Sequence, residues 1–368
     1  MKILHLNAGA ETGGGMVHIL ALLNGLNKDE FILGVMEKGK MYEEAKKKGI
    51  NVKHFSQASR YDLSIIKQIA DYIVKENIDI LHTHGPRANL MGYIIKKISK
   101  VKWIVTVHSD PRDDFLGSGI KGKIFTKINM LTLRNVDHYF AISDRFKEML
   151  IQFKINEKRI TTIYNGIDFN LDIPITVTRQ RMGYSNNDFI LLMVARLHPV
   201  KGHKEAFQAI SNLITTYPNI RLLLVGDGPL KEELQEKIAY LNLEENVKLL
   251  GHREDVHSLL SISDIKILTS YSESFPLVIL EAARAKVPVI TTDVGGVEKL
   301  IKDSSYGWII PIKDIQCLER AILEAYNLKR TNELKSKGEK LYHIASENYS
   351  VEKFCSSVYE TYRKILRQ

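Results

Sequence analysis

The sequence predicts an α/β protein made of two doubly wound domains, and two observations carry this prediction. Short apolar segments rich in β-branched residues alternate with segments of helical periodicity along the whole chain, a pattern typical of parallel sheets covered by helices on both faces. The alternation restarts near residue 188, after a polar stretch at 165–187 with scattered glycine, asparagine and aspartate residues. A length of 368 residues is sufficient for two such domains.

The predicted strands are short apolar runs. In the first half they are Lys2–Leu6, Ile80–His84, Trp103–His108, Tyr139–Ile142 and Ile160–Tyr164. In the second half they are Phe189–Ala195, Arg221–Val225, Val247–Leu250, Ile265–Thr269, Pro288–Thr292 and Trp308–Ile310. Open parallel sheets bind their ligands beyond the carboxyl ends of the strands. The residues that directly follow each strand are therefore the candidates for a site.

Helices are predicted between the strands, where apolar residues recur at helical spacing. Clear cases are Val17–Leu26, His203–Tyr217 and the last segment, Val351–Leu366. We expect residues 1–170 to form an N-terminal Rossmann-like domain and residues 171–350 to form a C-terminal one, the two facing each other across a cleft. The final helix follows the last strand and helix of the second domain.

Composition is that of a globular protein, with 44% hydrophobic and 26% charged residues. The two cysteines, Cys317 and Cys355, lack the spacing of a metal site and form no disulfide framework, which fits a reducing compartment. The first residues alternate like a strand and contain no cleavable apolar region, and no apolar run approaches the ~18 residues of a membrane span. We therefore expect a cytoplasmic protein.

The positive charge is concentrated in the first half of the chain. The formal net charge is +9, yet residues 1–170 alone contain 26 Lys and Arg against 18 Asp and Glu. A one-sided basic surface favours a polyanionic partner such as anionic lipid headgroups or a phosphorylated lipid carrier. The alternative is a merely solubilising surface. No aromatic-interleaved platform accompanies the basic residues, so nucleic acid is not an expected partner.

Two groups of candidates follow strands of the first half. Gly13, Gly14 and Gly15 precede a helix, where glycines allow a ligand close to free backbone N–H groups. The G-x-G-x-x-G fingerprint is absent, and a plain turn is the alternative reading. His82 and His84 share one face of a strand without a third ligand nearby, so no metal is expected. His108 stands at a strand end and is a candidate for contact with a reacting group, or else a structural histidine.

In the second half, Arg196 and Lys201 leave the same strand end just before a helix. An arginine fork beside a lysine point charge suits a diphosphate that must be neutralised as it leaves. The turn Gly226–Pro229 follows the next strand, and could border a nucleotide or be a simple βα turn.

The strongest constellation is Ser270–Leu277 followed by Glu281. Pro276 suits the first turn of a helix, and Ser274 with the N–H groups that follow it suits an anion. Glu273 precedes this helix and Glu281 lies inside it, so that two carboxylates bracket a polar ligand and can accept hydrogen bonds from sugar hydroxyls. The helix is otherwise apolar, so we expect Glu281 to be buried or to line a cleft, next to a ligand or a cationic partner.

Taken together, these residues resemble the family 4 retaining glycosyltransferases, which have the two-domain GT-B fold. The resemblance covers nearly the whole chain, and many of its pieces occur in order. They are Gly13–Gly15, His82-x-His84-Gly85, Ala141–Ser143, Tyr164–Asp168, Val194–Arg196 with Lys201-Gly202, Gly226–Pro229, the pair Glu273-x7-Glu281 and Gly295–Glu298.

The resemblance implies an enzyme that transfers a hexose or N-acetylhexosamine from a nucleoside-diphosphate sugar. Its nucleotide is expected to be UDP, because UDP-sugars are the most frequent donors in this family. On the donor side, the resemblance implies that Arg196 and Lys201 clamp the diphosphate, that Glu281 holds the ribose and that Arg253 lies near the base. It also implies that the donor is bordered by Glu273, Ser274, Phe275, Pro276 and Leu277. In the first domain it implies that His108 contacts the sugar, that Gly14 and Gly15 lie near the diphosphate and acceptor, and that the final helix crosses back onto this domain. Like the family, the chain lacks a D-x-D metal motif, which Asp110–Asp114 does not supply, so no metal or other cofactor is expected.

Other readings stay open. A sugar-nucleotide 2-epimerase shares the fold, and an inactive scaffold could bind the donor without transfer. No residue is a clear nucleophile, which favours front-face attack for retention. The basic first half suits a lipid-linked or surface-polysaccharide acceptor, and peripheral association with the inner face of an anionic plasma membrane.

Overall fold

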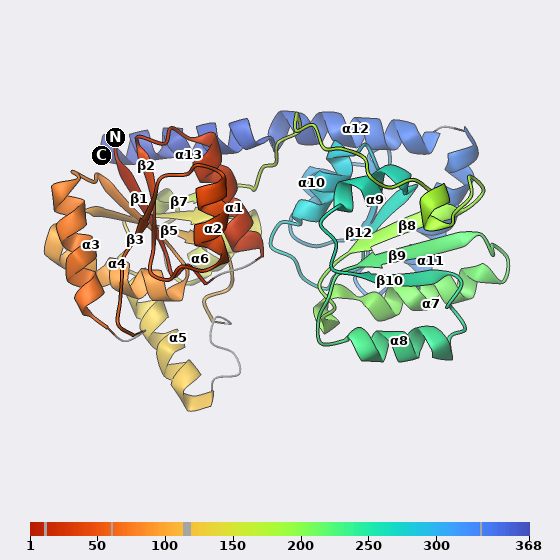
Figure 1. The fold of residues 1–368 in the computed structure, drawn as a ribbon, viewed down its shortest axis with the longest axis horizontal. Coiled ribbons are helices and arrows are strands. Elements are labelled where there is room, and N and C mark those ends of the chain that lie inside the picture. Colours follow the sequence, from red (N-terminus) through yellow and green to blue (C-terminus); the bar gives the residue numbers. More distant parts are fainter. Residues whose placement is uncertain (11–12, 60–61, 113–118, 332) are drawn as a thin grey trace. The chain divides into compact units, whose positions relative to one another are not determined.

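The computed structural model describes residues 1–10, 13–59, 62–112, 119–331 and 333–368. Its contacts divide the chain into two compact units. The first consists of Met1–Gly166 together with Val351–Gln368, and the second is Ile167–Ser350. Each unit is an open parallel sheet with helices on both faces (Figure 1).

The first unit holds a seven-stranded sheet in the order β3-β2-β1-β4-β5-β6-β7. Its strands are β1 (Ile3–Asn7), β2 (Phe31–Val35), β3 (Val52–His54), β4 (Ile80–His84), β5 (Lys102–Val107), β6 (His138–Ala141) and β7 (Ile160–Thr162). Its helices are α1 (Gly14–Gly25), α2 (Lys40–Lys47), α3 (Ser64–Lys75), α4 (Pro86–Ser99), α5 (Gly119–Leu133), α6 (Asp144–Gln152) and α13 (Val351–Leu366). The strand predictions missed β2 and β3, which are five and three residues long.

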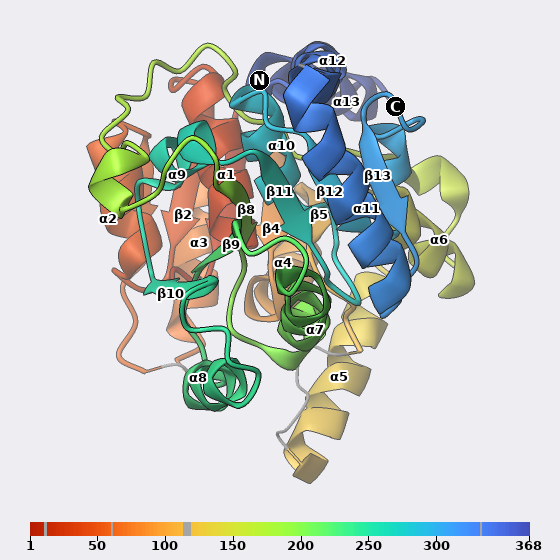
Figure 2. The ribbon, with the colours of Figure 1, turned by 90° about the vertical axis from the view of Figure 1, so that its right-hand side faces the viewer.

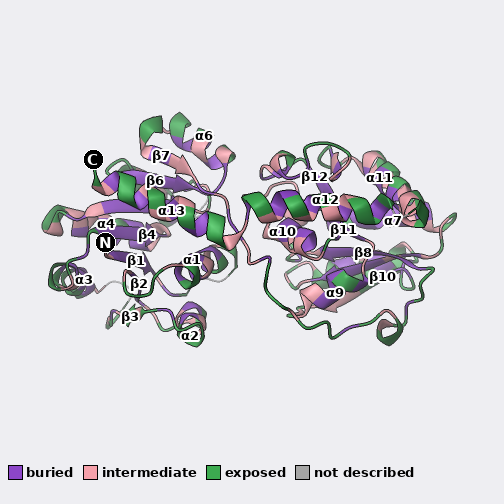
Figure 3. Cartoon of the chain, turned by 90° about the horizontal axis from the view of Figure 1, so that it is seen from above, coloured by how far each residue is buried: buried purple, intermediate pink, exposed green. Residues whose placement is uncertain are grey.

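Alternate residues of these strands enter two different cores, because successive side chains of a strand point to opposite faces. Leu4, Leu81 and Trp103 pack on one face with side chains of α3, α4 and α6. Ile3 and Ile80 pack on the other face with side chains of α1, α2 and α13. The last helix is therefore an integral part of the unit that contains the first strand. Figure 3 shows buried strands beneath helices whose outer sides are exposed.

The second unit holds a six-stranded parallel sheet in the order β10-β9-β8-β11-β12-β13. Its strands are β8 (Phe189–Val194), β9 (Ile220–Val225), β10 (Val247–Gly251), β11 (Ile265–Leu268), β12 (Val289–Thr292) and β13 (Gly307–Ile310). Its helices are α7 (His203–Ile214), α8 (Lys231–Tyr240), α9 (Val256–Ile262), α10 (Leu277–Arg284), α11 (Ile315–Leu328) and α12 (Glu333–Asn348). Helices α7 and α8 lie on one side of the sheet, and α9 and α10 on the other (Figures 1 and 2).

Both strand orders contain a point where the direction of winding reverses. In the first sheet it lies between β1 and β4, and in the second between β8 and β11. The loops that leave these neighbouring strands diverge to opposite faces, which opens a crevice at the carboxyl ends. Most of the candidate residues follow strands at or next to these two points, whereas Arg253 follows the edge strand β10.

Candidate functional site

The glycine-rich segment of the first unit leads from β1 into α1. Asn7, at the end of β1, accepts a hydrogen bond from Gly9 N at 2.7 Å and donates one to His84 O at 3.3 Å. Helix α1 begins at Gly14, and no described side chain caps its first turn. A Cβ atom built on Gly13 or Gly14 would meet no described atom within 4 Å. Packing against the described residues therefore does not require these glycines, and those residues leave space beside them for a ligand. Glu11 and Thr12 lie outside the described residues.

A chain of buried histidines lies beside this segment, on the sheet face that α13 covers. His5 Nδ1 lies 3.0 Å from His84 Nε2, and His84 Nδ1 lies 3.1 Å from His108 Nε2. At its other end the chain reaches the Tyr362 hydroxyl of α13, which is 3.2 Å from His5 Nε2 and 2.5 Å from His82 Nδ1. One hydrogen-bonded path thus connects the last helix to His108.

Burial keeps these histidines neutral. Desolvation lowers the pKa of His5 to about 3 and that of His18 to about 4. The pKa values of His82, His84 and His108 also fall well below the usual value, first through burial and then through neighbouring imidazoles. In a chain of neutral imidazoles each ring has one donor and one acceptor nitrogen. The tautomer of His108 is therefore coupled to those of His84 and His5.

The expectation that His82 and His84 have no third ligand nearby is wrong. His5 stands directly opposite His82 in the parallel pairing of β1 with β4, and ring nitrogens of His5, His82 and His84 lie within 4.8 Å of one another. Three imidazoles are enough for a zinc site. Here, however, their nitrogens already hydrogen-bond to one another, to Tyr362 and to Thr106.

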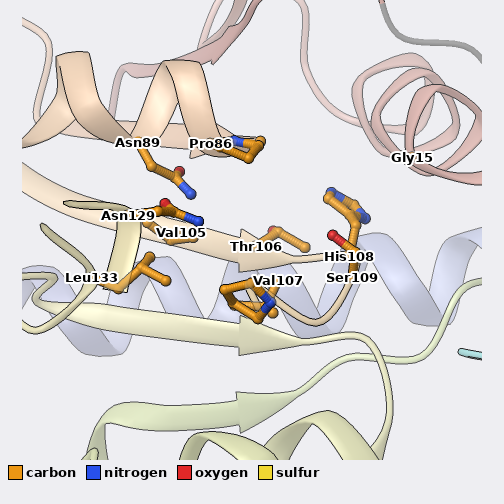
Figure 4. Close-up of a pocket in the computed structure, with 12 residues that line it drawn as sticks. Gly15, Pro86, Asn89, Val105, Thr106, Val107, His108, Ser109, Asn129 and Leu133 are labelled. Carbon is orange, nitrogen blue, oxygen red and sulfur yellow. The ribbon is translucent and has the colours of Figure 1, made fainter. Parts of the chain in front are cut away.

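His108 opens onto a cavity of about 250 Å³ in the first unit. Asn89, Thr106, Ser109 and Asn129 supply polar groups to its lining (Figure 4). Asn89 is held by Thr83, whose hydroxyl donates to Asn89 Oδ1 at 2.7 Å. The cavity can therefore accommodate a small polar group within reach of His108. Of the segment Asp110–Asp114, Asp110 pairs with Arg112, and Asp113 and Asp114 lie outside the described residues.

In the second unit, Lys201 and Glu273 form an ion pair at the point where β8 and β11 diverge. Lys201 Nζ lies 2.6 Å from Glu273 Oε1, which also accepts a hydrogen bond from Ser270 Oγ at 2.6 Å. Both charged side chains are mostly buried, with 21% and 15% of their surface exposed. The loops carrying them touch closely: a Cβ on Gly202 would lie 2.0 Å from Thr269 O, so only glycine permits this contact.

Arg196 follows β8 and is exposed. Its loop is supported by the turn Gly226–Pro229, where a Cβ on Gly226 would lie 1.9 Å from Ala195 O and Leu197 N donates to Asp227 O at 3.0 Å. The turn therefore supports the arginine loop through its backbone. Arg253, after the edge strand β10, makes a bidentate pair with Asp255 at 2.7 and 2.6 Å.

The segment before α10 presents its side chains unevenly. The helix begins at Leu277, and Pro276 is the extended N-cap residue, one position before the first turn that the sequence predicted. Phe275 is buried and stacks on Tyr349 of the same unit, with ring centroids 5.2 Å apart. Phe275 therefore anchors the segment, and any ligand contact at this position falls to the backbone.

Glu281 lies in α10 facing cationic neighbours. Burial raises the pKa of Glu281, while Arg284 and Lys266 oppose that shift. Lys266, which the sequence reading missed, lies in β11, is fully buried and donates to Ile267 O at 2.8 Å. Burial lowers the pKa of Lys266 to about 7, against the influence of Glu281 and Glu273. A lysine inside an otherwise apolar central strand was the signal that could have revealed it.

Comparisons with known proteins agree with this geometry. Residues 175–341 match the family of glycosyl transferases group 1, and residues 12–171 match glycosyltransferase family 4. The chain is 30% identical over 316 residues to N-acetyl-alpha-D-glucosaminyl L-malate synthase of Bacillus anthracis, covering 83% of this chain and 80% of the relative. It is 26% identical to UDP-Gal:alpha-D-GlcNAc-diphosphoundecaprenol alpha-1,3-galactosyltransferase of Escherichia coli, covering 74% and 72%.

A solved structure has the same fold. The crystal structure of Anabaena HepE in complex with UDP superposes with a TM-score of 0.85 at 23% sequence identity, covering 99% of this chain and all of that one. At this identity the likeness establishes the fold.

Proposed function

This chain belongs to the family 4 glycosyltransferases of the GT-B fold, and we propose that it transfers a hexose or N-acetylhexosamine, with retention, from a UDP-sugar to a lipid-linked or surface-polysaccharide acceptor. The observation that carries the donor side is the cluster of Lys201, Glu273, Lys266 and Glu281 around the β8/β11 divergence. Buried opposite charges at a ligand-binding crevice are costly to maintain without a polar ligand to bind.

The roles follow from the chemistry of the donor. The bond between the anomeric carbon and the diphosphate oxygen breaks, and its electron pair leaves with the diphosphate. Arg196 and Lys201 neutralise that departing charge, which makes a metal ion unnecessary. Glu281 accepts hydrogen bonds from the ribose diol, and Glu273 orients Lys201 beside the sugar. Ser274 and the backbone of 275–277 border the diphosphate. We assign Arg253 to the base, and Gly14 and Gly15 to the approach of diphosphate and acceptor.

For the transfer itself we propose front-face attack. The acceptor oxygen forms the new bond on the face that the diphosphate leaves, and the acceptor proton passes to the departing diphosphate oxygen. His108 is neutral and contacts the transferred sugar as a hydrogen-bonding partner. A glycosyl group trapped covalently on any side chain would contradict this mechanism.

The acceptor class is supported by charge and by relatives. Residues 1–170 carry nearly all of the positive charge excess. The Escherichia coli relative is named for a diphosphoundecaprenol acceptor, and a phosphatidylinositol N-acetylglucosaminyltransferase subunit of Saccharomyces cerevisiae is also similar. No helix in the described parts of the chain is long and apolar enough to cross a membrane. On the basis of the charge and of the acceptor named for the Escherichia coli relative, we propose peripheral attachment to the cytoplasmic face of an anionic membrane.

A donor panel tests the reaction. Each nucleotide sugar is incubated with the purified protein in EDTA, and nucleoside diphosphate release and the shift in Tm are measured. We expect one UDP-sugar to give both signals, Glu281→Ala to abolish them, and the exposed Glu236→Ala on α8 to retain them. Binding without release would leave the donor-binding scaffold, and conversion of the free donor to its 2-epimer would identify the epimerase.

Liposome flotation tests the membrane proposal separately. We expect the protein to float with vesicles that contain anionic lipid and to stay at the bottom with neutral vesicles. Equal behaviour with both kinds of vesicle would remove the membrane proposal and leave the donor chemistry untouched.

A further inference from the structure

An apolar groove of about 480 Å³ lies on the first unit between α3, α4 and α5. Its lining is almost entirely hydrocarbon and comprises Leu63, Ile66, Pro86, Arg87, Leu90, Met91, Ile94, Phe125, Ile128 and Asn129. Several of these side chains are open to water: 69% of Leu63, 42% of Phe125 and 37% of Ile128 are exposed. Exposed apolar surface gathered in a groove marks a binding site more often than scattered exposed residues do.

Helix α5 flanks the groove with positive charge. Its sequence, GIKGKIFTKINMLTL, carries Lys121, Lys123 and Lys127 and no acidic residue. All three lysines are exposed. A surface with apolar side chains beside lysines is complementary to a molecule that joins hydrocarbon to an anionic headgroup. A second copy of this basic unit would instead bring like charges together across the groove, which is unfavourable.

The groove adjoins the cavity at His108. Both are lined by Pro86 and Asn129, at the start of α4 and on α5. One side of this shared boundary is hydrocarbon, and the other presents the polar groups of Asn89, Thr106, His108 and Ser109 (Figure 4). This arrangement matches an amphiphile whose polar head enters the cavity while its chain lies in the groove.

We propose that the α3–α4–α5 groove binds the hydrocarbon chain of the lipid-linked acceptor and thereby delivers its phosphorylated head to the His108 cavity. This inference rests on the proposed glycosyl transfer. It specifies the acceptor as one phosphorylated lipid molecule whose hydrocarbon chain moves from the bilayer into the groove. Burial of each methylene favours binding by a similar increment, so affinity rises with chain length until the groove is filled.

The test is a titration with farnesyl phosphate, followed by calorimetry, on the wild type and two double variants. Phe125→Ser with Ile128→Asn changes the groove. Ile124→Asn with Leu131→Asn is the matched control, because both residues are exposed on the same helix, by 55% and 51%, yet do not line the groove. All four positions are exposed, so both variants are expected to keep the Tm of the wild type.

We expect the groove variant to bind farnesyl phosphate at least ~10-fold more weakly, a loss that corresponds to removing well under one buried prenyl unit. The control should stay within about twofold. Equal losses in both variants would mean adsorption to the helix surface, and competition by inorganic phosphate alone would mean recognition of charge only. Either result would overturn the proposal that the groove binds the hydrocarbon chain.

Donor turnover separates this inference from the function it rests on. Release of nucleoside diphosphate in water requires no lipid, so the groove variant should retain wild-type rates. A protein that turns over a donor but shows no groove-dependent lipid binding would refute the inference and keep the function. A protein that binds farnesyl phosphate in the groove but releases no nucleoside diphosphate from any donor would refute the function.

Discussion

The two units place their polar residues at equivalent points of equivalent sheets, yet these residues are neutral in the first unit and charged in the second. At the β1/β4 divergence, histidines are buried neutral and satisfy one another through hydrogen bonds. At the β8/β11 divergence, Lys201 and Glu273 form a mostly buried ion pair, with Lys266 and Glu281 nearby. A network of neutral, hydrogen-bonded side chains can be buried in an apolar environment without a counter-charge. A network of ionised side chains is suited to a ligand that itself carries charge. The topology fixes where a site lies, and the side chains decide which charge it handles.

The largest expected difference between the two units is in how their stability responds to acid. Folding lowers the pKa values of five histidines, His5, His18, His82, His84 and His108. Below about pH 6.5, the ordinary pKa of histidine, the unfolded chain therefore binds more protons than the folded chain does. Stability is therefore complete above this pH and is lost as the pH falls below it. Each histidine contributes up to about 1.4 kcal/mol per pH unit, so we expect the first unit to lose at least ~5 kcal/mol by pH 5.

The two tryptophans make the measurement specific. Trp103 lies in the first unit and Trp308 in the second, so Trp308→Phe leaves a reporter of the first unit and Trp103→Phe leaves one of the second. Fluorescence followed from pH 7 to 4 should show the Trp103 transition first. Coincident transitions in the two variants would contradict the proposed contrast.

Removing a charge from the second unit should slow donor chemistry strongly and leave the histidines of the first unit unchanged. Lys201→Met deprives the leaving diphosphate of its cation and leaves Glu273 without its lysine partner. We expect kcat/KM for nucleoside diphosphate release to fall by about 10²–10³-fold, as when one preorganised electrostatic contact is lost. Lys204→Met, three residues further along in the first turn of α7, is the control and should retain activity. Retained turnover in Lys201→Met would remove this lysine from the mechanism.

Lys266 should cost the second unit stability in a pH-dependent manner. Its folded pKa of about 7 lies below the unfolded value near 10.4, so its burial penalty is full below pH 7 and fades as the pH rises toward 10.4. Glu281, Glu273 and Lys201 face this group. We expect Lys266→Met to stabilise the unit by ~2 kcal/mol at pH 6, and to lose this advantage by pH 10.

Urea unfolding in the Trp103→Phe background provides the comparison, with the exposed Lys231→Met as control. A stabilisation that is independent of pH would show that the side chain acts through packing alone. Donor binding by Lys266→Met, measured in the same preparation, should weaken because Glu281 and Glu273 lose a neighbouring cation.

The smallest expected effect concerns the end of the histidine chain. Tyr362→Phe removes the hydroxyl that contacts both His5 and His82 and leaves their nitrogens without that partner. We expect the first unit to lose about 1–3 kcal/mol, and the ¹⁵N shifts of His84 and His108 to change, because their tautomers are coupled to Tyr362. Tyr359→Phe, on the same helix, should alter neither. Unchanged histidine shifts in Tyr362→Phe would show that the chain is not coupled.

The sequence allowed much of the fold to be predicted, because apolar runs report buried parallel strands directly. Strands such as Ile80–His84 have the predicted bounds, whereas β3 has only three residues, and β2 was missed although it is as long as Ile80–His84. Arg196, Lys201 and Glu273 were identifiable because each stands just after a strand. The histidine chain was not, since His5 meets His82 through strand register and Tyr362 is 280 residues from His82. Contacts between distant segments leave no local periodicity to detect.

The position of α13 has a consequence for synthesis of the protein. Phe354, Val358, Tyr362 and Ile365 complete the core that begins with Ile3 of β1. A ribosome therefore releases every strand of the first sheet long before the helix that completes the cover of one of its faces. At about 5–20 residues per second, roughly 10–40 s separate residue 166 from residue 362. By the end of that interval the second unit has all of its own strands and can fold, while one face of the first sheet is covered by α1 and α2 but still lacks the apolar side chains of α13. The domain that is encoded first is thus the domain that matures last.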